Sequence, residues 1–406
     1  MAEILPFPGL FFDSERFKEP GEFIAPPYDV IKDKKSFLSL PYNITRITLS
    51  WDTEDYSRRG ELFRSWIKEG ILKPDTTPAF YLHYHYFTLG NEERVRKGIF
   101  ALVRLYPFEE RMILPHEETL PAPKEDRLKL LRELRTSLEP VFFLFPGGRN
   151  LWKELTGGER IFDFTLDGER HLLFAIRRED VQERIMNYLK KKKLYIADGH
   201  HRYETSLIYQ KENPSFTHIL GYLTSMEEEG LVILPAHRLI KKLERGAVER
   251  LLREGEKFFH ILPWKGEDFV SVLREKGRRH HAFLFYYHGS QPLLLVSRNE
   301  KKVEEEIPDH SPAWKRLDIS ILHSVIMEEI MGVREEELQR EGLLSYIVDK
   351  EEAWRRVEKG EFAAGFFLNP TSVEEVKRVA DRGEKMPGKA TYFYPKVPSG
   401  LVMVKP

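Results

Sequence analysis

One short stretch of the chain gathers residue types that bind anions. The sequence D-G-H-H-R occupies residues 198–202 and directly follows the apolar run Leu194–Ala197. That run predicts a short buried strand and Tyr203–Gln210 predicts a helix, so the polar pentad lies where a strand ends and a helix begins. Backbone N–H groups at such a junction lack intrahelical partners and favour anions. The pentad therefore predicts a phosphate-binding turn; the simpler alternative is an Asp N-cap followed by surface residues.

The members of the pentad suit this task in different ways. Gly199 lets the backbone approach a ligand closely. His200 and His201 add ring donors that can carry charge, and Arg202 adds a planar fork that matches a phosphate. Capping alone explains Asp198 but does not explain three consecutive basic residue types in the first turn of a helix.

A second candidate stretch, "ILPHEETLPAPKEDR", places His116, Glu117 and Glu118 after a strand and just before a helix. A carboxylate there could act as a general base towards a hydroxyl if it were held close to a bound phosphate donor. The same charges would also complement a helix N-terminus, and both interpretations stay open. His116 and Glu117 are residue types of a metal site, but the H-E-x-x-H spacing is missing, so zinc is not expected there.

Two loops supply further candidates for contacts to substrate. The irregular stretch 383–400, "GEKMPGKATYFYPKVPSG", could place Lys389 and Thr391 on a phosphate or an amino-acid carboxylate; alternatively, its "TYFYP" segment is an edge strand and its lysines are solvated. In "FIAPPYDVI", a rigid Pro-Pro turn would hold Tyr28 and Asp29 at a cleft, although turn chemistry alone also explains those residues. The pair His237 and Arg238, at the end of a strand, is expected at the surface.

The elements that must position these residues alternate between helices and strands. Expected strands include 46–51, 79–89 and 97–106, and the helical spacing that begins at Lys124 is followed by further helices and strands up to the C-terminus. This alternation, without a strict repeat, predicts an α+β protein with mixed sheets. We expect three domains: a strand-rich segment 1–106, a catalytic core with an insertion over 107–240, and an α/β segment 241–406 that completes the active site.

Composition narrows the functional classes. The 406-residue chain has a formal net charge of −1 and no cysteine, which excludes thiol catalysis, disulfides and Cys-ligated zinc. Its 32% charged residues are typical of a thermophilic source. The N-terminus has no basic region before an apolar run, and no apolar run is long enough for a membrane span, so a cytoplasmic protein without membrane contact is expected. Walker A, kinase Gly-rich loop, G-x-G-x-x-G and G-x-S-x-G motifs are missing, so phosphate chemistry needs another cradle.

The candidate motifs also resemble a known group of proteins. "ADGHHRYE" resembles the signature of the ParB/sulfiredoxin-like fold, in which a strand-to-helix turn binds nucleotide phosphates. The order of P-H-E, D-G-H-H-R and a C-terminal P-K-T-T-like loop is similar to that of the free L-serine kinases of this superfamily. Along its whole length the chain resembles the DUF1015 family, through A-P-P-Y-D-V, L-P-H-E-x-T, A-D-G-H-H-R and M-P-x-K-x-T-Y-F-Y-P.

This resemblance implies roles for particular residues. Glu117 would be the base that takes the proton from a serine hydroxyl, and Asp198 would assist at the transferring phosphate and its magnesium. Residues 199–202 would bind the phosphates, with His116 also at the nucleotide. The P-K-T-T loop is replaced by "PGKAT", with one residue inserted and Ala390 in place of the first Thr, so Lys389 and Thr391 match the family pattern only partly.

The implied reaction is phosphoryl transfer from ATP or ADP, with Mg²⁺, to the hydroxyl of free L-serine or a similar small compound. An alternative is a ParB-type nucleotide-binding hydrolase or switch without a serine acceptor. A DNA-associated scaffold is disfavoured, because neither a helix-turn-helix candidate nor a basic stripe is found and the net charge is near zero. Sulfiredoxin-like chemistry is excluded because it needs a cysteine.

Overall fold

The structure, a computed structural model, describes residues 1–16, 18–28, 30–31, 33–49, 56–119, 121–155, 158–266 and 268–406. The chain divides into two compact units. Unit 1 comprises residues 1–115, 119–232 and 393–406, and unit 2 comprises residues 116–118 and 233–392. Each unit is therefore assembled from segments that are far apart in the sequence.

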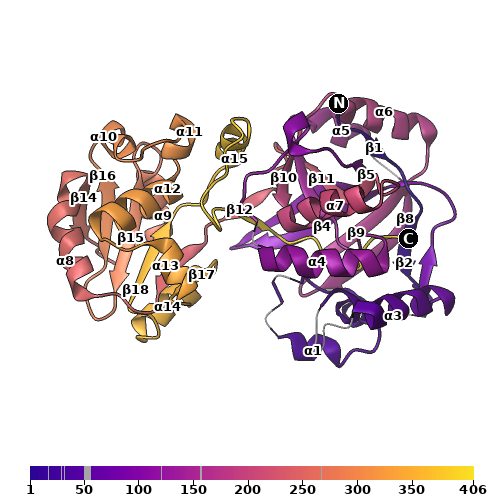
Figure 1. Cartoon of the computed structure of the whole chain (residues 1–406), viewed down its shortest axis with the longest axis horizontal. Coiled ribbons are helices and arrows are strands. Elements are labelled where there is room, and N and C mark those ends of the chain that lie inside the picture. The colour runs from indigo at the N-terminus through magenta and orange to yellow at the C-terminus, as the bar shows by residue number, and fades with distance from the viewer. Residues whose placement is uncertain are drawn as a thin grey trace. The chain divides into compact units, whose positions relative to one another are not determined.

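Unit 1 is built on a nine-stranded mixed sheet with the strand order β6-β10-β7-β11-β5-β4-β9-β8, in which β1 also pairs with β5 (Figure 1). Strand β10 runs parallel to β6 and antiparallel to β7, and β11 runs parallel to β7 and antiparallel to β5. The strands are β1 Ile4–Leu5, β4 Phe80–Leu89, β5 Glu92–Arg104, β6 Ile113–Leu114, β7 Val141–Phe145, β8 Glu159–Leu166, β9 Glu169–Ile176, β10 Leu194–Asp198 and β11 His218–Ser225.

The core of unit 1 lies on one face of this sheet. Residues such as Leu82, Ile99 and Phe143 alternate along their strands so that their side chains share that face, and they pack with residues of α6 and α7. A smaller sheet in the order β20-β2-β3 also belongs to this unit. The remaining elements are β2 Gly9–Phe12, β3 Leu72–Pro74, β20 Met403–Val404, η1 Pro20–Glu22, α1 Lys34–Leu38, α2 Thr45–Thr48, α3 Tyr56–Lys68, η2 Phe108–Glu110, α4 Pro121–Leu134, α5 Arg149–Glu154, α6 Glu179–Lys190 and α7 His200–Glu212.

Unit 2 contains a six-stranded antiparallel sheet in the order β14-β16-β15-β18-β13-β17. Its core includes Leu239, Leu284 and Phe367, which pack with Ala353 and Val357 of α14. The elements are β13 His237–Ile240, β14 Phe259–Pro263, β15 Ala282–Tyr287, β16 Leu293–Ser297, β17 Leu344–Ile347, β18 Ala364–Leu368, α8 Arg245–Glu254, η3 Gly255–Lys257, α9 Phe269–Lys276, α10 Glu300–Glu305, α11 Pro312–Lys315, α12 Asp318–Ile321, the π-helical η4 Leu322–Ile330, α13 Glu335–Arg340, α14 Lys350–Glu358 and α15 Val373–Ala380. Strands β12 Val232–Leu234 and β19 Tyr392–Tyr394 lie where the chain passes between the units.

The expected α+β class with mixed sheets is confirmed, and so are the strands at 79–89 and 97–106. The strand expected at 46–51 is wrong over residues 46–48, which belong to the short helix α2, while 50 and 51 lie outside the described residues. The side chain of Asn43 accepts a hydrogen bond from the backbone N of Thr45 at 3.1 Å. This Asx-type turn directly precedes the helical turn, which forms despite the β-branched composition.

The division into two units differs from the three segments expected from the sequence. Segment 1–106 and most of 107–240 share the nine-stranded sheet, because β5 pairs with β11 from the second segment. The surface position expected for His237 and Arg238 is wrong: both side chains are buried inside unit 2. Among the described residues, no helix combines the length and the apolar character needed to span a bilayer.

Candidate functional site

The D-G-H-H-R pentad forms the predicted strand–turn–helix junction in unit 1. Strand β10 ends at Asp198 and α7 begins at His200, with Gly199 between them at φ 90°. This left-handed conformation favours glycine. A Cβ atom on Gly199 would lie 2.9 Å from Arg202 Nε, because the Arg202 side chain folds back over the turn. The glycine therefore provides both the backbone conformation and the space for the arginine.

Asp198 is the centre of a charged cluster at this junction. Its Oδ2 accepts a hydrogen bond from Arg202 Nη2 at 2.6 Å, and its Oδ1 accepts one from Lys396 Nζ at 2.5 Å. Arg202 also donates to the carbonyl oxygen of Pro140. All three charged side chains are less than one-fifth exposed, so solvent screens their interaction only weakly. One carboxylate and two cations leave a net positive charge at the N-terminus of α7, which suits an anionic ligand.

The first turn of α7 contains the two histidines. His200 is buried, whereas His201 is half-buried. Gly199 occupies the N-cap position, and no described side chain caps this end of the helix. One turn further, Glu204 accepts hydrogen bonds from Thr119 Oγ1 at 2.5 Å and from Lys124 Nζ at 3.1 Å. The start of α7 is thus fixed by the segment that leads into α4.

Tyr28 is held by a second charged group in unit 1. Its backbone N donates to Glu139 Oε1 at 3.3 Å, and the guanidinium of Arg127 lies 4.1 Å from the centre of its ring. Glu139 is only 5% exposed and also accepts a hydrogen bond from Ser399 Oγ at 2.6 Å. Asp29, the other residue predicted in this loop, lies outside the described residues.

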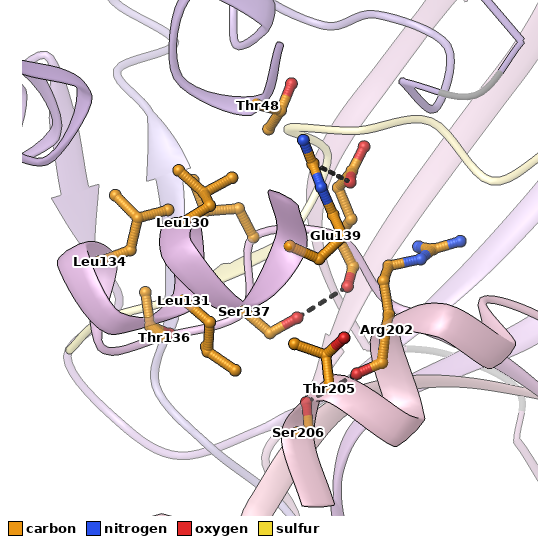
Figure 2. A pocket seen from close by; sticks show the side chains of 12 residues that line it. Thr48, Leu130, Leu131, Leu134, Thr136, Ser137, Glu139, Arg202, Thr205 and Ser206 are labelled. Carbon is orange, nitrogen blue, oxygen red and sulfur yellow. Dashed lines mark hydrogen bonds and ion pairs between the residues drawn. The ribbon is translucent and has the colours of Figure 1, made fainter. Parts of the chain in front are cut away.

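A small pocket joins these two groups (Figure 2). Arg202 and Glu139 both line it, and in Figure 2 the guanidinium of Arg202 points away from the leucines of the pocket. Ser137 Oγ donates to the carbonyl oxygen of Glu139 at 2.9 Å, and Ser206 Oγ donates to that of Arg202 at 2.9 Å. The lining residues are Thr48, Arg127, Leu130, Leu131, Leu134, Thr136, Ser137, Leu138, Glu139, Arg202, Thr205 and Ser206. The pocket combines an apolar floor with charged groups, as small-molecule sites do.

The P-H-E stretch and the C-terminal loop come together inside unit 2. His116 Nε2 lies 2.9 Å from Thr391 Oγ1, and Thr391 Oγ1 donates to Glu117 Oε1 at 3.3 Å. Because the hydroxyl hydrogen points to the carboxylate, Thr391 Oγ1 can accept a hydrogen bond from His116, which requires the proton on Nε2. The backbone N of Met386 donates to the carbonyl oxygen of His116 at 2.8 Å. Glu117 is therefore oriented by a hydroxyl group.

Arg238 holds the backbone of the loop that carries Lys389. Its Nη2 donates to the carbonyl oxygens of Gly388 at 2.9 Å and Lys389 at 3.2 Å. Burial lowers the pKa of the Arg238 guanidinium to about 10, and the charge of Glu335 works in the opposite direction. Lys389 itself has φ 54° and an exposed side chain. The arginine expected at the surface is thus an internal support of the candidate loop.

The structure brings the predicted residues together in two groups. Asp198, Gly199, His200, His201 and Arg202 share the junction in unit 1, and His116, Glu117 and Thr391 share a hydrogen-bonded group in unit 2. Sequence reasoning missed three residues, namely Arg127, Glu139 and Lys396. Lys396 and Arg127 had a signal, because Lys396 lies in the same Pro-rich stretch as Lys389 and Arg127 ends the candidate stretch that contains Glu117, whereas Glu139 had none.

The fold and site define a mixed-sheet protein with a charged strand–turn–helix junction. The chain belongs to the DUF1015 family, described as "Protein of unknown function (DUF1015)", whose pattern matches residues 4–320. No curated protein matches the chain.

Solved structures of low similarity include a conserved hypothetical protein from Pyrococcus furiosus, with 15% identity and a TM-score of 0.39 over 76% of this chain and 95% of that one. Another is a free serine kinase in complex with AMP, with 16% identity and a TM-score of 0.38 over 73% of this chain and 86% of that one. A third is a C-terminally truncated SbnI from Staphylococcus aureus, with 14% identity and a TM-score of 0.38 over 75% and 87% of the respective chains.

Proposed function

We propose that this protein is a nucleotide-dependent kinase that phosphorylates the hydroxyl of a small molecule, with free L-serine as the first acceptor to test. The observation that carries the proposal is the Asp198 cluster, in which Arg202 and Lys396 place two cations at the N-terminus of α7. Helix-end amides and paired cations are what a polyphosphate chain requires. The motif order P-H-E, D-G-H-H-R and PGKAT adds the resemblance to serine kinases.

In this proposal the charged cluster rearranges when a nucleotide binds. Arg202 and Lys396 exchange the Asp198 carboxylate for phosphate oxygens, and His200 and His201 donate from the first turn of the helix. Asp198 would be the ligand for Mg²⁺, which prefers oxygen ligands and would neutralise phosphate charge when bound. The preformed ion pairs with Asp198 keep both cations ordered before the nucleotide arrives. This order lowers the entropic cost of binding.

Glu117 is the proposed general base. Thr391 Oγ1 orients its carboxylate, and His116 holds Thr391 in turn. The proposed contacts to the substrate are Lys389, Thr391, Tyr28 and Asp29.

The test is incubation with ATP or ADP, Mg²⁺ and a panel of free amino acids and small alcohols, followed by phosphorus NMR. We expect O-phosphoserine from the parent protein. Glu117→Gln should lower turnover by about 10²–10⁴-fold while nucleotide affinity, measured by calorimetry, stays unchanged. The matched control is Glu118→Gln, which removes the neighbouring carboxylate.

Two outcomes contradict the proposal. If the Glu117→Gln variant phosphorylates the acceptor at the parent rate, Glu117 is not the base. If the protein hydrolyses nucleotide at a rate that free serine and the other acceptors do not change, the alternative hydrolase or switch is the better description.

A further inference from the structure

Three buried histidines in unit 1 take no part in the proposed kinase site. We propose that His83, His85 and His171 bind one divalent transition-metal ion of the zinc class. Each residue offers a ligand atom, and these atoms all lie within 4.8 Å of one another. The proposal is independent of the kinase activity, since the cluster lies on strands β4 and β9 and includes none of the residues assigned above.

The register of the sheet places the histidines on one face. His85 lies directly opposite His171 in the β4–β9 pair, and His83 precedes His85 by two residues on the same strand. Side chains directly across a strand pair, and at alternate positions along a strand, project from the same face. The spacing H-x-H on one strand, with a third histidine opposite, is therefore enough to bring three imidazoles together.

The distances between the rings are close to those of ligands that share an ion. His83 Nε2 and His171 Nδ1 are 3.0 Å apart. Two nitrogens bound to one zinc ion at about 2.0–2.1 Å are roughly 3.4 Å apart in tetrahedral geometry. Small side-chain rotations that lengthen this N–N distance by a fraction of an ångström would let both nitrogens bind one ion. The third ring is adjacent, since the ring centroids of His85 and His171 are 4.1 Å apart.

The contact between His83 and His171 can hold either one proton or one ion. His83 Nδ1 is buried and has no hydrogen-bond partner among the described residues, and the His83 side chain is fully buried. Between His83 and His171, only one proton can occupy the 3.0 Å contact. An ion at this contact would bind the lone pairs of His83 Nε2 and His171 Nδ1 at once and would leave the proton of His83 on Nδ1.

A carboxylate lies where metal sites usually have one. Glu169 Oε2 is 2.6 Å from His85 Nε2, and Tyr394 Oη donates to Glu169 Oε1 at 2.9 Å. A metal-bound histidine usually donates its other ring N–H to a carboxylate, which orients the ring and raises its basicity. Arg96 Nη2 lies within hydrogen-bond distance of His85 Nδ1, at 3.4 Å, so an ion bound by Nδ1 would displace this contact. The negative charge of Glu169 offsets the charge of Arg96.

The ligand set indicates the class of metal. Neutral imidazole nitrogens suit Zn²⁺, Cu²⁺, Ni²⁺ and related ions, whereas Mg²⁺ and Ca²⁺ prefer oxygen ligands. Three histidines leave a fourth position for water. The Glu169 side chain is 24% exposed, so the carboxylate lies at the accessible edge of the cluster, where an ion would enter.

Metal binding by the full-length protein tests this proposal. After treatment with a chelator, the protein is titrated with Co²⁺, and the visible absorption of tetrahedral cobalt and the bound metal by mass spectrometry are followed. We expect equimolar binding that Zn²⁺ displaces and Mg²⁺ does not. Glu169→Gln should weaken Co²⁺ binding about 10–100-fold. His171→Phe, which keeps a ring against Phe164, should abolish it.

His218→Gln is the matched control, because it removes a half-buried histidine of the same sheet that lies outside the cluster. Circular dichroism establishes that each variant is folded. Failure of the parent protein to bind Co²⁺ or Zn²⁺ overturns the proposal. So does equal binding by folded His171→Phe, which would place the ion at other residues.

Discussion

At the scale of single residues, Asp198 is bound to two cations of different origin. Arg202 comes from the same turn and Lys396 from a segment 198 residues later. The sequence places the first partner in the same motif because D-G-H-H-R is contiguous, although it predicted Arg202 as a phosphate ligand and not as a partner of Asp198. It does not predict the second, since a contact over that separation depends on how the whole unit folds. For the same reason Glu139, which joins Tyr28 to Arg127, gave no signal in the sequence.

The two lysines of the C-terminal stretch should have different functions. Lys396→Met removes a cation that pairs with Asp198, so nucleotide affinity should fall about 10–100-fold, as for the loss of a hydrogen bond to a charged group. Lys389→Met makes the same chemical change in an exposed loop and should alter the Michaelis constant for the acceptor instead. Calorimetry with nucleotide and acceptor-dependent kinetics separate the two effects. Equal nucleotide affinity in parent and Lys396→Met would remove Lys396 from the phosphate site.

At the scale of elements, β10, Gly199 and α7 are predictable because a local pattern specifies them. An apolar run, a glycine and a helical period follow one another within 19 residues, from Leu194 to Glu212. Helix α3 and strands β8 and β9 were not anticipated, and α2 was expected as a strand. In α2, the side chain of Asn43 accepts a hydrogen bond from the backbone N of Thr45 just before the helical turn, and the β-branched composition of residues 45–48 gives no sign of this turn.

Gly199→Ala should show the strain at this junction. An alanine at φ 90° raises the conformational free energy of the folded state by about 1–2 kcal/mol. Its Cβ would also displace the Arg202 side chain. Gly168 is the control, at φ 83° in the β8–β9 turn. No neighbouring atom lies within 4 Å of a Cβ position there, so Gly168→Ala introduces backbone strain without a clash. Urea denaturation should show a larger loss of unfolding free energy for Gly199→Ala, together with weaker nucleotide binding. Equal losses would mean that Arg202 moves aside without cost.

At the scale of the whole molecule, the class of the fold was predictable, but the division of the chain into two units was not. Periodicity identifies strands and helices one at a time, but the pairing of β5 with β11 joins segments separated by more than a hundred residues. The return of residues 393–406 to unit 1 is a long-range event of the same kind. His237 and Arg238 show that exposure cannot be judged from neighbouring residues in the sequence. Two polar residues at the end of a strand were expected to be exposed, but the rest of unit 2 buries both.

Unit 2 should lose stability in acid because of His237. Burial lowers the pKa of His237 to about 3, with a further contribution from Arg238. In the unfolded chain the pKa of histidine is about 6.5, so between these values the unfolded state binds the extra proton and the free energy of unfolding rises with pH. Between pH 7 and pH 5, protonation of this residue in the unfolded chain should lower the free energy of unfolding by about 2 kcal/mol. Above pH 7 this residue should not change the free energy of unfolding further.

His237→Phe removes the titrating group and keeps a ring near Phe367, whose centroid lies 5.0 Å away. Between pH 7 and pH 5, the free energy of unfolding measured by urea denaturation should therefore fall by about 2 kcal/mol less in this variant than in the parent. His260→Phe, at an exposed position of β14, is the control. A parallel pH dependence of the parent and His237→Phe would contradict this prediction, because it would mean that His237 has the same pKa in the folded and unfolded states.

The segmented make-up of unit 1 has a consequence for biosynthesis. Asp198 is synthesised 198 residues before Lys396. A nascent chain therefore carries the aspartate–arginine turn without its lysine until those residues have been added. If the proposed phosphate site is correct, a product truncated before Lys396 would lack one of its two cations and bind nucleotide weakly.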